Sequence, residues 1–363
     1  METLIITQGL DPKSGWGRYS LGIVSELQKR KAAIRILTEE IPRADARHGT
    51  FLPLGGPFDF LINLHRIRRF ARGVGVVHAF DGWPYGVYGY FAVLGTKKKL
   101  FINGVGTYAV APLGDFGKGW LMKLAYRRAN KIFCISRYVK GEIEKRISLP
   151  NLEVVHLASD PLPSLSEEEI ESKKEKYQIR NASPVLLTVG AIKHRKGQLD
   201  TVRAVALLKD RYPDILYLLI GSEEVYYANH IREYAKEKGL ERNVRILSDI
   251  KSDEDLAFFY SISDVFLLNS RNDGRHFEGF GLVFLEAANQ GRPVIGSRGC
   301  GIEDALEDGY NGYLAEQGNA EDVRDKVMKA LAQSESLGLN SREFASRFSW
   351  VKTVDSYIRY YQK

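Results

Sequence analysis

Short apolar segments recur along the chain, and each leads into a turn or a pattern typical of a helix. The first half contains four of them, at residues 4–7, 74–79, 99–103 and 131–136. The second half contains five, at residues 184–189, 215–220, 243–247, 264–268 and 294–296. Strands that alternate with helices form parallel α/β sheets. Because the charged residues 164–177 separate the two sets, the sequence predicts two Rossmann-like domains.

The length of the chain agrees with two domains. It has 363 residues, of which 44% are hydrophobic, enough for each domain to bury its own core. We expect the first domain at residues 1–163 and the second at residues 164–345. Residues 346–363 have the pattern of an amphipathic helix rich in aromatic side chains. Since ligands bind outside the carboxyl ends of the strands in such sheets, the loops after the strands should carry the site.

No apolar run approaches the ~20 residues that a membrane span needs, and no charged leader with an apolar core opens the chain. We therefore expect a soluble protein of the cytoplasm. Cys134 and Cys300 lie in apolar or glycine-rich surroundings that are typical of reduced thiols. Neither has a second ligand at zinc-like spacing and the histidines are scattered, so we expect no metal and no cofactor.

Positive charge is concentrated in the first half of the chain. The formal charge is +7 overall, but residues 1–160 hold 24 Lys and Arg against 13 Asp and Glu. The excess lies in clusters at residues 65–72, 97–99, 127–128 and 140–146. Base-reading motifs and interleaved aromatic residues are absent, so we expect no nucleic-acid partner. An anionic membrane surface or an anionic acceptor fits better, with a merely soluble basic face as the alternative.

Two carboxylates flank a glycine turn late in the second set of strands. Glu278 and Glu286 lie on either side of a Gly-Phe-Gly turn that opens an apolar run, residues 282–288. Gln-Gly-Arg-Pro closes this run, which predicts a loop entering a short helix. Unpaired N–H groups at a helix start attract phosphate, and glycines let a ligand approach the backbone. Taken singly, Glu286 is an ordinary helix acid and Glu278 a solvated loop charge, but together with the glycines they favour a sugar-nucleotide site.

The same residues resemble the retaining glycosyltransferases of the GT-B fold, glycosyltransferase family 4, whose signature is two glutamates separated by seven residues. The likeness continues through Gly-Arg-Pro-Val at 291–294 and Asp-Gly-Tyr-Asn-Gly-Tyr-Leu at 308–314. It implies two Rossmann-like domains facing each other across a cleft. It also implies that the C-terminal helix, residues 346–363, crosses back to pack on the first domain.

The loop after residues 184–189 carries cations beside glycines, which suits a diphosphate, with a plain basic turn as the alternative. The resemblance implies that Lys196 neutralises the leaving diphosphate and that Glu286 binds the ribose hydroxyls. It also implies that Glu278 faces the donor sugar and stabilises charge at the anomeric carbon. The expected catalytic residues are Glu278, Lys196 and Arg195. The expected donor-binding residues are Gly15, Gly17, Gly190, Lys193, Ile250, Gly279, Phe280, Gly281, Leu282 and Glu286.

Some of these assignments have simple alternatives. Ile250 belongs to the loop at residues 248–251, whose backbone the resemblance puts at the nucleobase, but an ordinary polar turn explains this loop equally well. Gly15 and Gly17, in a turn-rich loop expected before a helix from residue 18, resemble the glycine loop under the diphosphate. A dehydrogenase fingerprint would place a third glycine where Ser20 stands, which argues against a nicotinamide enzyme.

The acceptor side is assigned to the first domain. The candidates there are Asp81, Thr107, Tyr108 and Ser136, and Ser136 is equally well explained as a helix N-cap. The sequence departs from the family pattern at two positions. Val105 stands where many relatives have a loop histidine, so that histidine is either dispensable or partly replaced by Thr107, Tyr108 or Asp81. Ala191 stands where the family usually has a phosphate-binding arginine, and Lys193 or Arg195 is the hypothesised substitute.

The function predicted is metal-independent, retaining transfer of a glucose- or mannose-like hexose from a nucleotide diphosphate sugar to a hydroxyl acceptor. A glycan or lipid-linked glycan is the preferred acceptor, and the basic first half suggests a place at the membrane surface. A non-catalytic nucleotide-sugar-binding protein is the alternative that Val105 and Ala191 suggest. A GT-B epimerase or phosphorylase is the alternative among enzymes.

Overall fold

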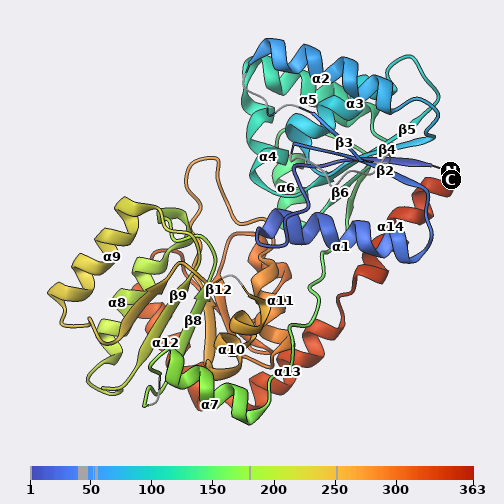
Figure 1. The fold of residues 1–363 in the computed structure, drawn as a ribbon. Helices are drawn as coiled ribbons and strands as arrows, with labels where there is room; N and C mark the ends of the chain where they lie inside the picture. The colour runs from blue at the N-terminus through green and yellow to red at the C-terminus, as the bar shows by residue number, and fades with distance from the viewer. Residues whose placement is uncertain (1, 40–47, 52, 54–55, 180, 251) are drawn as a thin grey trace. The chain divides into compact units, whose positions relative to one another are not determined.

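The structure is a computed structural model that describes residues 2–39, 48–51, 53, 56–179, 181–250 and 252–363. The chain divides into two compact units (Figure 1). Unit 1 comprises Met1–Ala158 together with Phe348–Lys363, and unit 2 comprises Ser159–Arg347. Each unit is built around its own parallel sheet.

The sheet of unit 1 has seven strands within the described residues, in the order β3-β2-β1-β4-β5-β6-β7, and every pairing is parallel. The order reverses between β1 and β4, which makes the loops after these two strands the switch point of the sheet. The strands are β1 (Thr3–Ile6), β2 (Ile34–Thr38), β3 (His48–Thr50), β4 (Val76–Ala79), β5 (Lys99–Gly104), β6 (Lys131–Cys134) and β7 (Leu152–Val154).

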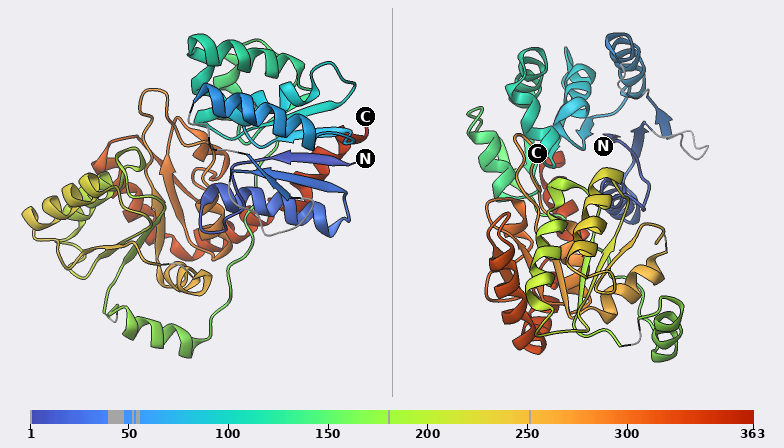
Figure 2. Two further views of the ribbon diagram at one scale, coloured as in Figure 1. Left: turned by 45° about the horizontal axis from the view of Figure 1, so that its top comes forward. Right: turned by 90° about the vertical axis from the view of Figure 1, so that its left-hand side faces the viewer.

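Helices cover both faces of this sheet. Helices α1 and α14 pack against each other on one face, whereas α2, α3 and α5 lie on the opposite face (Figures 1 and 2). The helices of unit 1 are α1 (Gly15–Lys29), α2 (Pro57–Phe70), α3 (Val87–Val93), α4 (Thr107–Val110), α5 (Phe116–Arg128), α6 (Arg137–Glu144) and α14 (Trp350–Gln362). Short helical turns η1 (Gly82–Gly86) and η2 (Ala111–Gly114) flank α3 and α4.

The C-terminal helix α14 is tied to the sheet of unit 1 by buried polar contacts. The imidazole of His78 in β4 hydrogen-bonds Tyr361 through Nδ1 and Asn103 through Nε2, at 2.5 and 2.8 Å. Asn103 Nδ2 in turn donates to the hydroxyl of Tyr19. Burial lowers the pKa of His78 to about 3, although the bond to Asn103 opposes this. His78 is therefore neutral at physiological pH, as a buried network without a counter-ion requires.

Unit 2 contains a six-stranded sheet within the described residues, with strand order β10-β9-β8-β11-β12-β13 and parallel pairings throughout. Its order reverses between β8 and β11. The strands are β8 (Val185–Val189), β9 (Leu216–Ile220), β10 (Val244–Leu247), β11 (Val265–Leu268), β12 (Val294–Ser297) and β13 (Gly312–Ala315). The helices are α7 (Glu167–Lys176), α8 (Gln198–Leu208), α9 (Val225–Glu237), α10 (Asp253–Ile262), α11 (Leu282–Asn289), α12 (Ala320–Ala332) and α13 (Ser334–Ser346), with short turns η3 (His194–Lys196) and η4 (Gly301–Asp304).

The core of unit 2 lies between its sheet and the helices α8, α9 and α12. Val202 and Val205 of α8 and Val323 and Val327 of α12 are fully buried there against the sheet residue Leu267. A strand that is buried on both faces appears in the sequence as a continuous apolar run. Such runs predicted β8, β9 and β11. A rigid core at this place fixes the loops that leave the carboxyl ends of β8 and β11.

The predicted α/β fold with two Rossmann-like sheets is confirmed, and several local predictions need correction. The helix predicted from residue 18 begins at Gly15, because the hydroxyl of Ser14 accepts from the N–H of Gly17 and caps it. Gly17 also lies against the carbonyl oxygen of Asp11, 1.8 Å from an ideal Cβ, so only glycine fits. The charged segment at 164–177 contains α7, which starts with a capping box of Ser166 and Glu169.

Candidate functional site

The loop after β8 brings three cations to the switch point of unit 2. Lys193 precedes the 3₁₀ turn of His194–Lys196, and the turn ends at Gly197 with a left-handed φ of 67°. An ideal Cβ on Gly197 would lie 1.9 Å from the carbonyl oxygen of Asn269, at the end of β11. This close approach of the two switch-point loops therefore requires glycine. Burial and the neighbouring charges of Arg195 and Lys196 lower the pKa of Lys193.

Glu278 lies at the centre of this cluster. Lys196 Nζ donates to Glu278 Oε2 at 2.6 Å, and Arg195 Nη1 donates to the same oxygen at 3.3 Å. The hydroxyl of Ser270 donates to it as well, at 3.3 Å. The N–H of Gly301 holds the backbone carbonyl of Glu278 at 2.8 Å. The structure thus brings together Glu278, Lys196 and Arg195, the three residues expected to be catalytic.

The two cations decide the protonation of Glu278. Burial alone would raise its pKa, but the charges and hydrogen bonds of Lys196 and Arg195 outweigh burial and lower the pKa to about 2 from 4.5. A carboxyl with a lowered pKa stabilises the fold above pH 4.5, and this contribution is lost only as the pH falls toward 2. Glu278 is therefore an anion throughout the physiological range, and it partly neutralises the cations that a diphosphate would meet.

An ion pair to a buried carboxylate fixes the two loops of this cluster to each other. Asp200, in the first turn of α8, is 1% exposed. Arg271 Nε donates to Asp200 Oδ2 at 2.6 Å, and its Nη2 donates to Oδ1. The backbone N–H of Arg271 donates to the carbonyl of Arg195 at 2.7 Å. Asp200 lies in the helix that directly follows the cation loop. Its carboxylate therefore positions the segment that leads to Glu278.

Replacing Asp200 with Asn should destabilise unit 2 by about 2–3 kcal/mol, because it leaves the guanidinium of Arg271 without its buried counter-ion. The loosened loop should also weaken nucleoside diphosphate binding several-fold. Equilibrium unfolding and calorimetric titration measure the two effects. Arg203→Gln is the matched control, since the partly exposed Arg203 contacts the same carboxylate at 3.4 Å. This variant should lower the free energy of unfolding by less than about 1 kcal/mol. Equal losses in the two variants would contradict the positioning role.

Glu286 and the Gly-Phe-Gly turn lie where the sequence predicted a loop entering a helix. Gly281, in the left-handed region at φ 87°, is the N-cap residue of α11 and offers no side-chain cap. Gly279, Phe280 and Leu282 adjoin it, so their backbone groups lie at the start of the helix. Glu286 is only 4% exposed, and the hydroxyl of Tyr260 donates to its Oε2 at 3.0 Å. Little of this carboxylate is accessible from solvent in the structure.

The other donor-side residues also lie at the carboxyl edge of the unit 2 sheet. Gly190 directly follows β8, and its N–H donates to the carbonyl of Ile220 at 2.8 Å. The carbonyl of Ala191 accepts from the side-chain amide of Gln198. Ile250 follows β10 and is half-buried, whereas Lys251 of the same loop lies outside the described residues.

The residues assigned to unit 1 follow β1, β4, β5 and β6 at the carboxyl edge of its sheet. Gly15 and Gly17 lie in the first turn of α1, and Thr107 and the exposed Tyr108 begin α4. Ser136 is fully buried, and its hydroxyl accepts from the N–H of Val139 at the start of α6. The N-cap role left open for Ser136 is thus the one seen in the structure.

Asp81 is a buried carboxyl directly after β4. Its Oδ1 accepts from the N–H of Gly82 at 2.7 Å and from the N–H of Val105 at 3.3 Å. Burial raises the pKa of Asp81 to about 8 from 3.8, although these two hydrogen bonds oppose the shift. Val105 therefore contacts Asp81 through its backbone N–H. Asp81 is a protonated acid over most of the neutral range.

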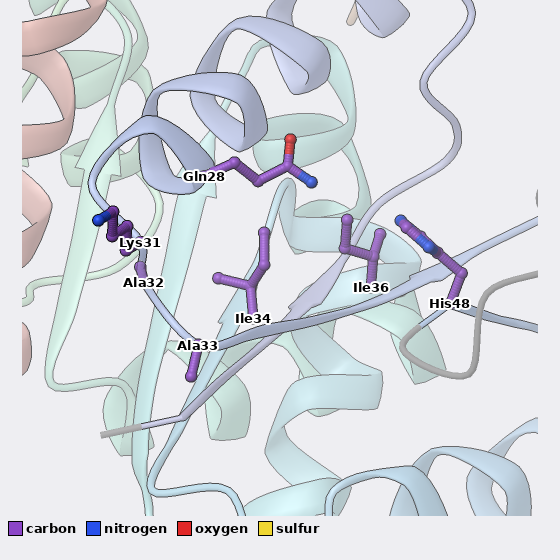
Figure 3. A pocket seen from close by; sticks show the side chains of 7 residues that line it. All are labelled: Gln28, Lys31, Ala32, Ala33, Ile34, Ile36 and His48. Atoms are coloured by element: carbon purple, nitrogen blue, oxygen red, sulfur yellow. The ribbon is translucent and has the colours of Figure 1, made fainter.

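A pocket in unit 1 lies away from these loops (Figure 3). It is bounded by the C-terminal end of α1 and by the start of β2, at the opposite edge of the sheet from the strand ends that carry the candidate residues. Its lining residues are Gln28, Lys31, Ala32, Ala33, Ile34, Ile36 and His48. Within the part of the chain that is described, no three His, Cys, Asp or Glu side chains are grouped so as to hold a metal ion.

Sequence reasoning missed three contributors to the site: Asp200, Ser270 and Tyr260. Asp200 and Tyr260 lie inside helices that the sequence did not connect with the loops, and each acts through a contact distant in sequence. Ser270 directly precedes the segment that carries Glu278, and a polar residue at the end of a strand was the one signal that could have identified it.

Solved structures share the fold of the whole chain. A structure of Alr3699/HepE from Anabaena in complex with UDP and glucose has a TM-score of 0.81 and 18% identity, covering 99% of this chain and 98% of that one. At this identity the likeness concerns the fold, which is the GT-B fold with two Rossmann-like domains.

Two family models match consecutive parts of the chain. The model described as Glycosyltransferase Family 4 matches residues 13–161, and the model described as Glycosyl transferases group 1 matches residues 169–346. Together they account for most of the sequence, and the second one contains the whole cluster around Glu278. The second half of the chain is therefore similar to the glycosyl transferases group 1, and the first half to glycosyltransferase family 4.

Curated relatives agree with these two matches. An uncharacterized glycosyltransferase of Methanocaldococcus jannaschii is 28% identical over 316 residues, which cover 84% of this chain and 80% of that protein. A serotype-specific mannosyltransferase, WbdA, of Escherichia coli is 27% identical over 269 residues, which cover 69% of this chain. The matched region spans about a third of the length of the latter protein, 32%.

Proposed function

We propose that this protein transfers a hexose, glucose- or mannose-like, from a nucleotide diphosphate sugar to a hydroxyl of a glycan or lipid-linked glycan, with retention of the anomeric configuration. The observation that carries the proposal is the cluster of Glu278, Lys196 and Arg195 at the switch point of unit 2. Two cations at that point can take a diphosphate, and an anion between them can face the sugar. The GT-B neighbour in complex with UDP and glucose supports this class of donor.

The chemistry follows from where charge develops. The bond between the anomeric carbon and the diphosphate breaks, and its electron pair goes to the phosphate oxygen. Lys196 and Arg195 stabilise this oxygen, and Glu278 stabilises the positive charge that grows on the sugar. The acceptor hydroxyl then forms a bond to the same face of the anomeric carbon, and its proton passes to the departing phosphate. Fixed cations can neutralise the leaving group, so we propose that no divalent metal or other cofactor takes part.

The remaining assignments are part of the same proposal. Gly15, Gly17, Gly190, Lys193, Ile250 and the turn before α11 bind the donor, and Glu286 binds the ribose after Tyr260 releases it. Asp81, Thr107 and Tyr108 serve the acceptor. We place the protein in the cytoplasm, peripherally at the membrane, where a lipid-linked acceptor is presented; among the described residues no helix is long and apolar enough to cross a bilayer.

A panel of uridine, guanosine and adenosine diphosphate sugars tests the proposal. The full chain, in the presence of a metal chelator, should bind one nucleotide class and slowly release nucleoside diphosphate from its sugar into water. With an acceptor present, proton NMR should show a product with the anomeric configuration of the donor. An inverted product would overturn retention, and a reaction that starts only when metal is restored would overturn metal independence.

A non-catalytic nucleotide-sugar-binding protein is the second candidate. Two features of the sequence favour it: Val105 stands where the resemblance would place a loop histidine, and Ala191 where it would place a phosphate-binding arginine. It predicts tight binding of one sugar nucleotide without any release of nucleoside diphosphate, even with glycan and lipid acceptors. An epimerase would release nucleoside diphosphate without an acceptor and change the sugar, and a phosphorylase would depend on phosphate.

A further inference from the structure

Two helices of unit 1 expose large apolar side chains near their N-terminal ends. On α2, Phe58 is 82% exposed and Leu61 is 61% exposed. On α5, Phe116 is fully exposed and Trp120 is 63% exposed. Single exposed apolar residues are common on proteins, but several large ones at corresponding places on two helices indicate a binding surface.

Cations continue both of these stripes toward the helix C-terminal ends. On α2, Leu61 is followed at helical spacing by the polar His65 and then by the cation Arg69, and on α5 Trp120 is followed by Lys123 and Arg127. Residues three or four positions apart lie on one side of a helix, so each exposed stripe begins apolar and ends basic. We call these residues, together with Arg66, Phe58 and Phe116, the α2–α5 surface.

The two helices present this pattern on the same side of unit 1. Helix α3 packs against both α2 and α5, and all three cover the face of the sheet opposite α1 and α14 (Figures 1 and 2). Phe60 of α2 stacks on Tyr88 of α3, with ring centroids 5.3 Å apart. Because both helices connect parallel strands, both start at the carboxyl edge of the sheet. Their apolar ends therefore share one edge, and their basic ends lie toward the other.

The charge of this region selects an anionic partner. Residues 57–128 hold 11 Lys and Arg and three Asp, and one of these three is the buried Asp81. In the described part of the chain, Arg66, Arg69, Lys123 and Arg127 make no ion pair. A cation without a partner is well solvated in water, and its free energy falls when it approaches negative charge.

We propose that the α2–α5 surface binds the anionic face of a lipid bilayer. Tryptophan, phenylalanine and leucine beside lysine and arginine suit the boundary between acyl chains and headgroups, where apolar side chains insert and cations meet phosphates. A duplex nucleic acid would use the cations but leave Phe58, Leu61 and Phe116 in water, and a single strand would stack bases on the rings but leave Leu61 in water. The biological reason for this binding rests on the proposed function, since a lipid-linked acceptor is presented at such a surface. The binding itself does not require that the protein transfer a sugar.

Cosedimentation of the full chain with vesicles tests it, using phosphatidylcholine alone and phosphatidylcholine mixed with phosphatidylglycerol. The protein should sediment with the anionic vesicles only, and salt should release it. Phe116→Ser/Trp120→Ser and Arg66→Glu/Arg69→Glu should each lower the vesicle-bound to free ratio at least tenfold. Tyr226→Ser/Lys236→Glu on α9 of unit 2 is the matched control, since both residues are exposed, and it should bind as the unaltered protein does.

Nucleoside diphosphate binding, measured without vesicles, separates this inference from the proposed function. It should be the same in all variants, because none of the altered residues lies in the donor cluster of unit 2. Vesicle binding that is absent, equal on neutral lipid, or unchanged in both α2–α5 variants would overturn the inference while leaving nucleotide binding intact. Retention on immobilised single-stranded DNA through these cations, without vesicle binding, would also overturn it.

Discussion

Replacing Glu278 with Gln should lower kcat by about 10²- to 10³-fold and leave nucleoside diphosphate binding as tight as before, or tighter. Glu278 supplies the negative charge between two cations. Its Oε2 lies 2.6 Å from Lys196 Nζ and 3.3 Å from Arg195 Nη1. Without it, less negative charge faces the sugar as the bond to the leaving group breaks, which costs about 3–4 kcal/mol of transition-state stabilisation. The two cations lose their internal counter-ion at the same time, so a diphosphate meets more positive charge.

Glu286→Gln should have the opposite signature. It leaves the cluster of cations intact and removes the carboxylate proposed to bind the ribose, so nucleotide binding should weaken by about tenfold with a smaller change in kcat. Calorimetric titration with nucleoside diphosphate and initial rates at saturating donor separate the two effects. Glu241→Gln, at an exposed position of unit 2, is the control and should change neither quantity. Equal effects of the Glu278 and Glu286 variants on binding would contradict this division of roles.

The fold could be predicted from the sequence because the central strands are buried on both faces. Runs such as residues 184–189 and 264–268 contain almost only apolar residues and end in turns, which is the pattern of a parallel sheet. The two edge strands of unit 1 gave no comparable signal. Strand β3 is the three residues His48–Thr50 and β7 is Leu152–Val154, and neither has an apolar run of its own. Their pairing depends on neighbours that are distant in sequence.

The predicted start of α1, at residue 18, was wrong for a local reason. The Gly-Trp-Gly sequence has low helix propensity, so a loop was predicted through Gly17. The cap from Ser14 and the contact with Asp11 outweigh that propensity, as tertiary context often does. The serine alone is a weak cap signal among so many turn residues, and its partner could be identified only from the structure.

For the donor site, spacing located Glu278 and the cation loop, since both are local motifs at the ends of strands. Spacing could not show that Asp200 fixes Arg271, or that Tyr260 holds Glu286, because each pair joins segments 71 or 26 residues apart. Nor could it show that the two expected carboxylates differ in environment. Glu278 is surrounded by cations and ionised, whereas Glu286 is buried beside a tyrosine hydroxyl. This difference is why we expect the two variants to behave differently.

Asp81→Asn should stabilise the protein increasingly as the pH rises from 5 to about 8, by a few kcal/mol at the upper end, and the difference should then level off. The folded pKa of Asp81 is about 8, because burial disfavours the charged form, against 3.8 in an exposed position. A carboxyl with a raised pKa favours the fold below pH 3.8, and this contribution is lost as the pH rises through 8. Asparagine does not titrate, so its difference from the unaltered protein should follow the titration of Asp81, at about 1.4 kcal/mol per pH unit.

The geometry makes this substitution conservative. Both backbone donors, the N–H groups of Gly82 and Val105, meet the same oxygen, Oδ1. An asparagine carbonyl can accept from both, and its amide takes the place of the protonated oxygen. Urea unfolding at several pH values measures the effect. His78 also titrates abnormally, but it is present in both proteins, so its contribution cancels in the difference. Asp210→Asn, at an exposed position, is the matched control.

The same variant separates a structural role for Asp81 from a role toward the acceptor. If Asp81 only supports the loop that contains Val105, Asp81→Asn should be more stable at pH 8 and transfer sugar at the normal rate. If the carboxyl contacts the acceptor hydroxyl, kcat/KM for the acceptor should fall by tenfold or more, while slow release of nucleoside diphosphate into water stays unchanged. A stability difference that is constant from pH 5 to 9 would contradict the raised pKa and, with it, the protonated acid beside the backbone of Val105.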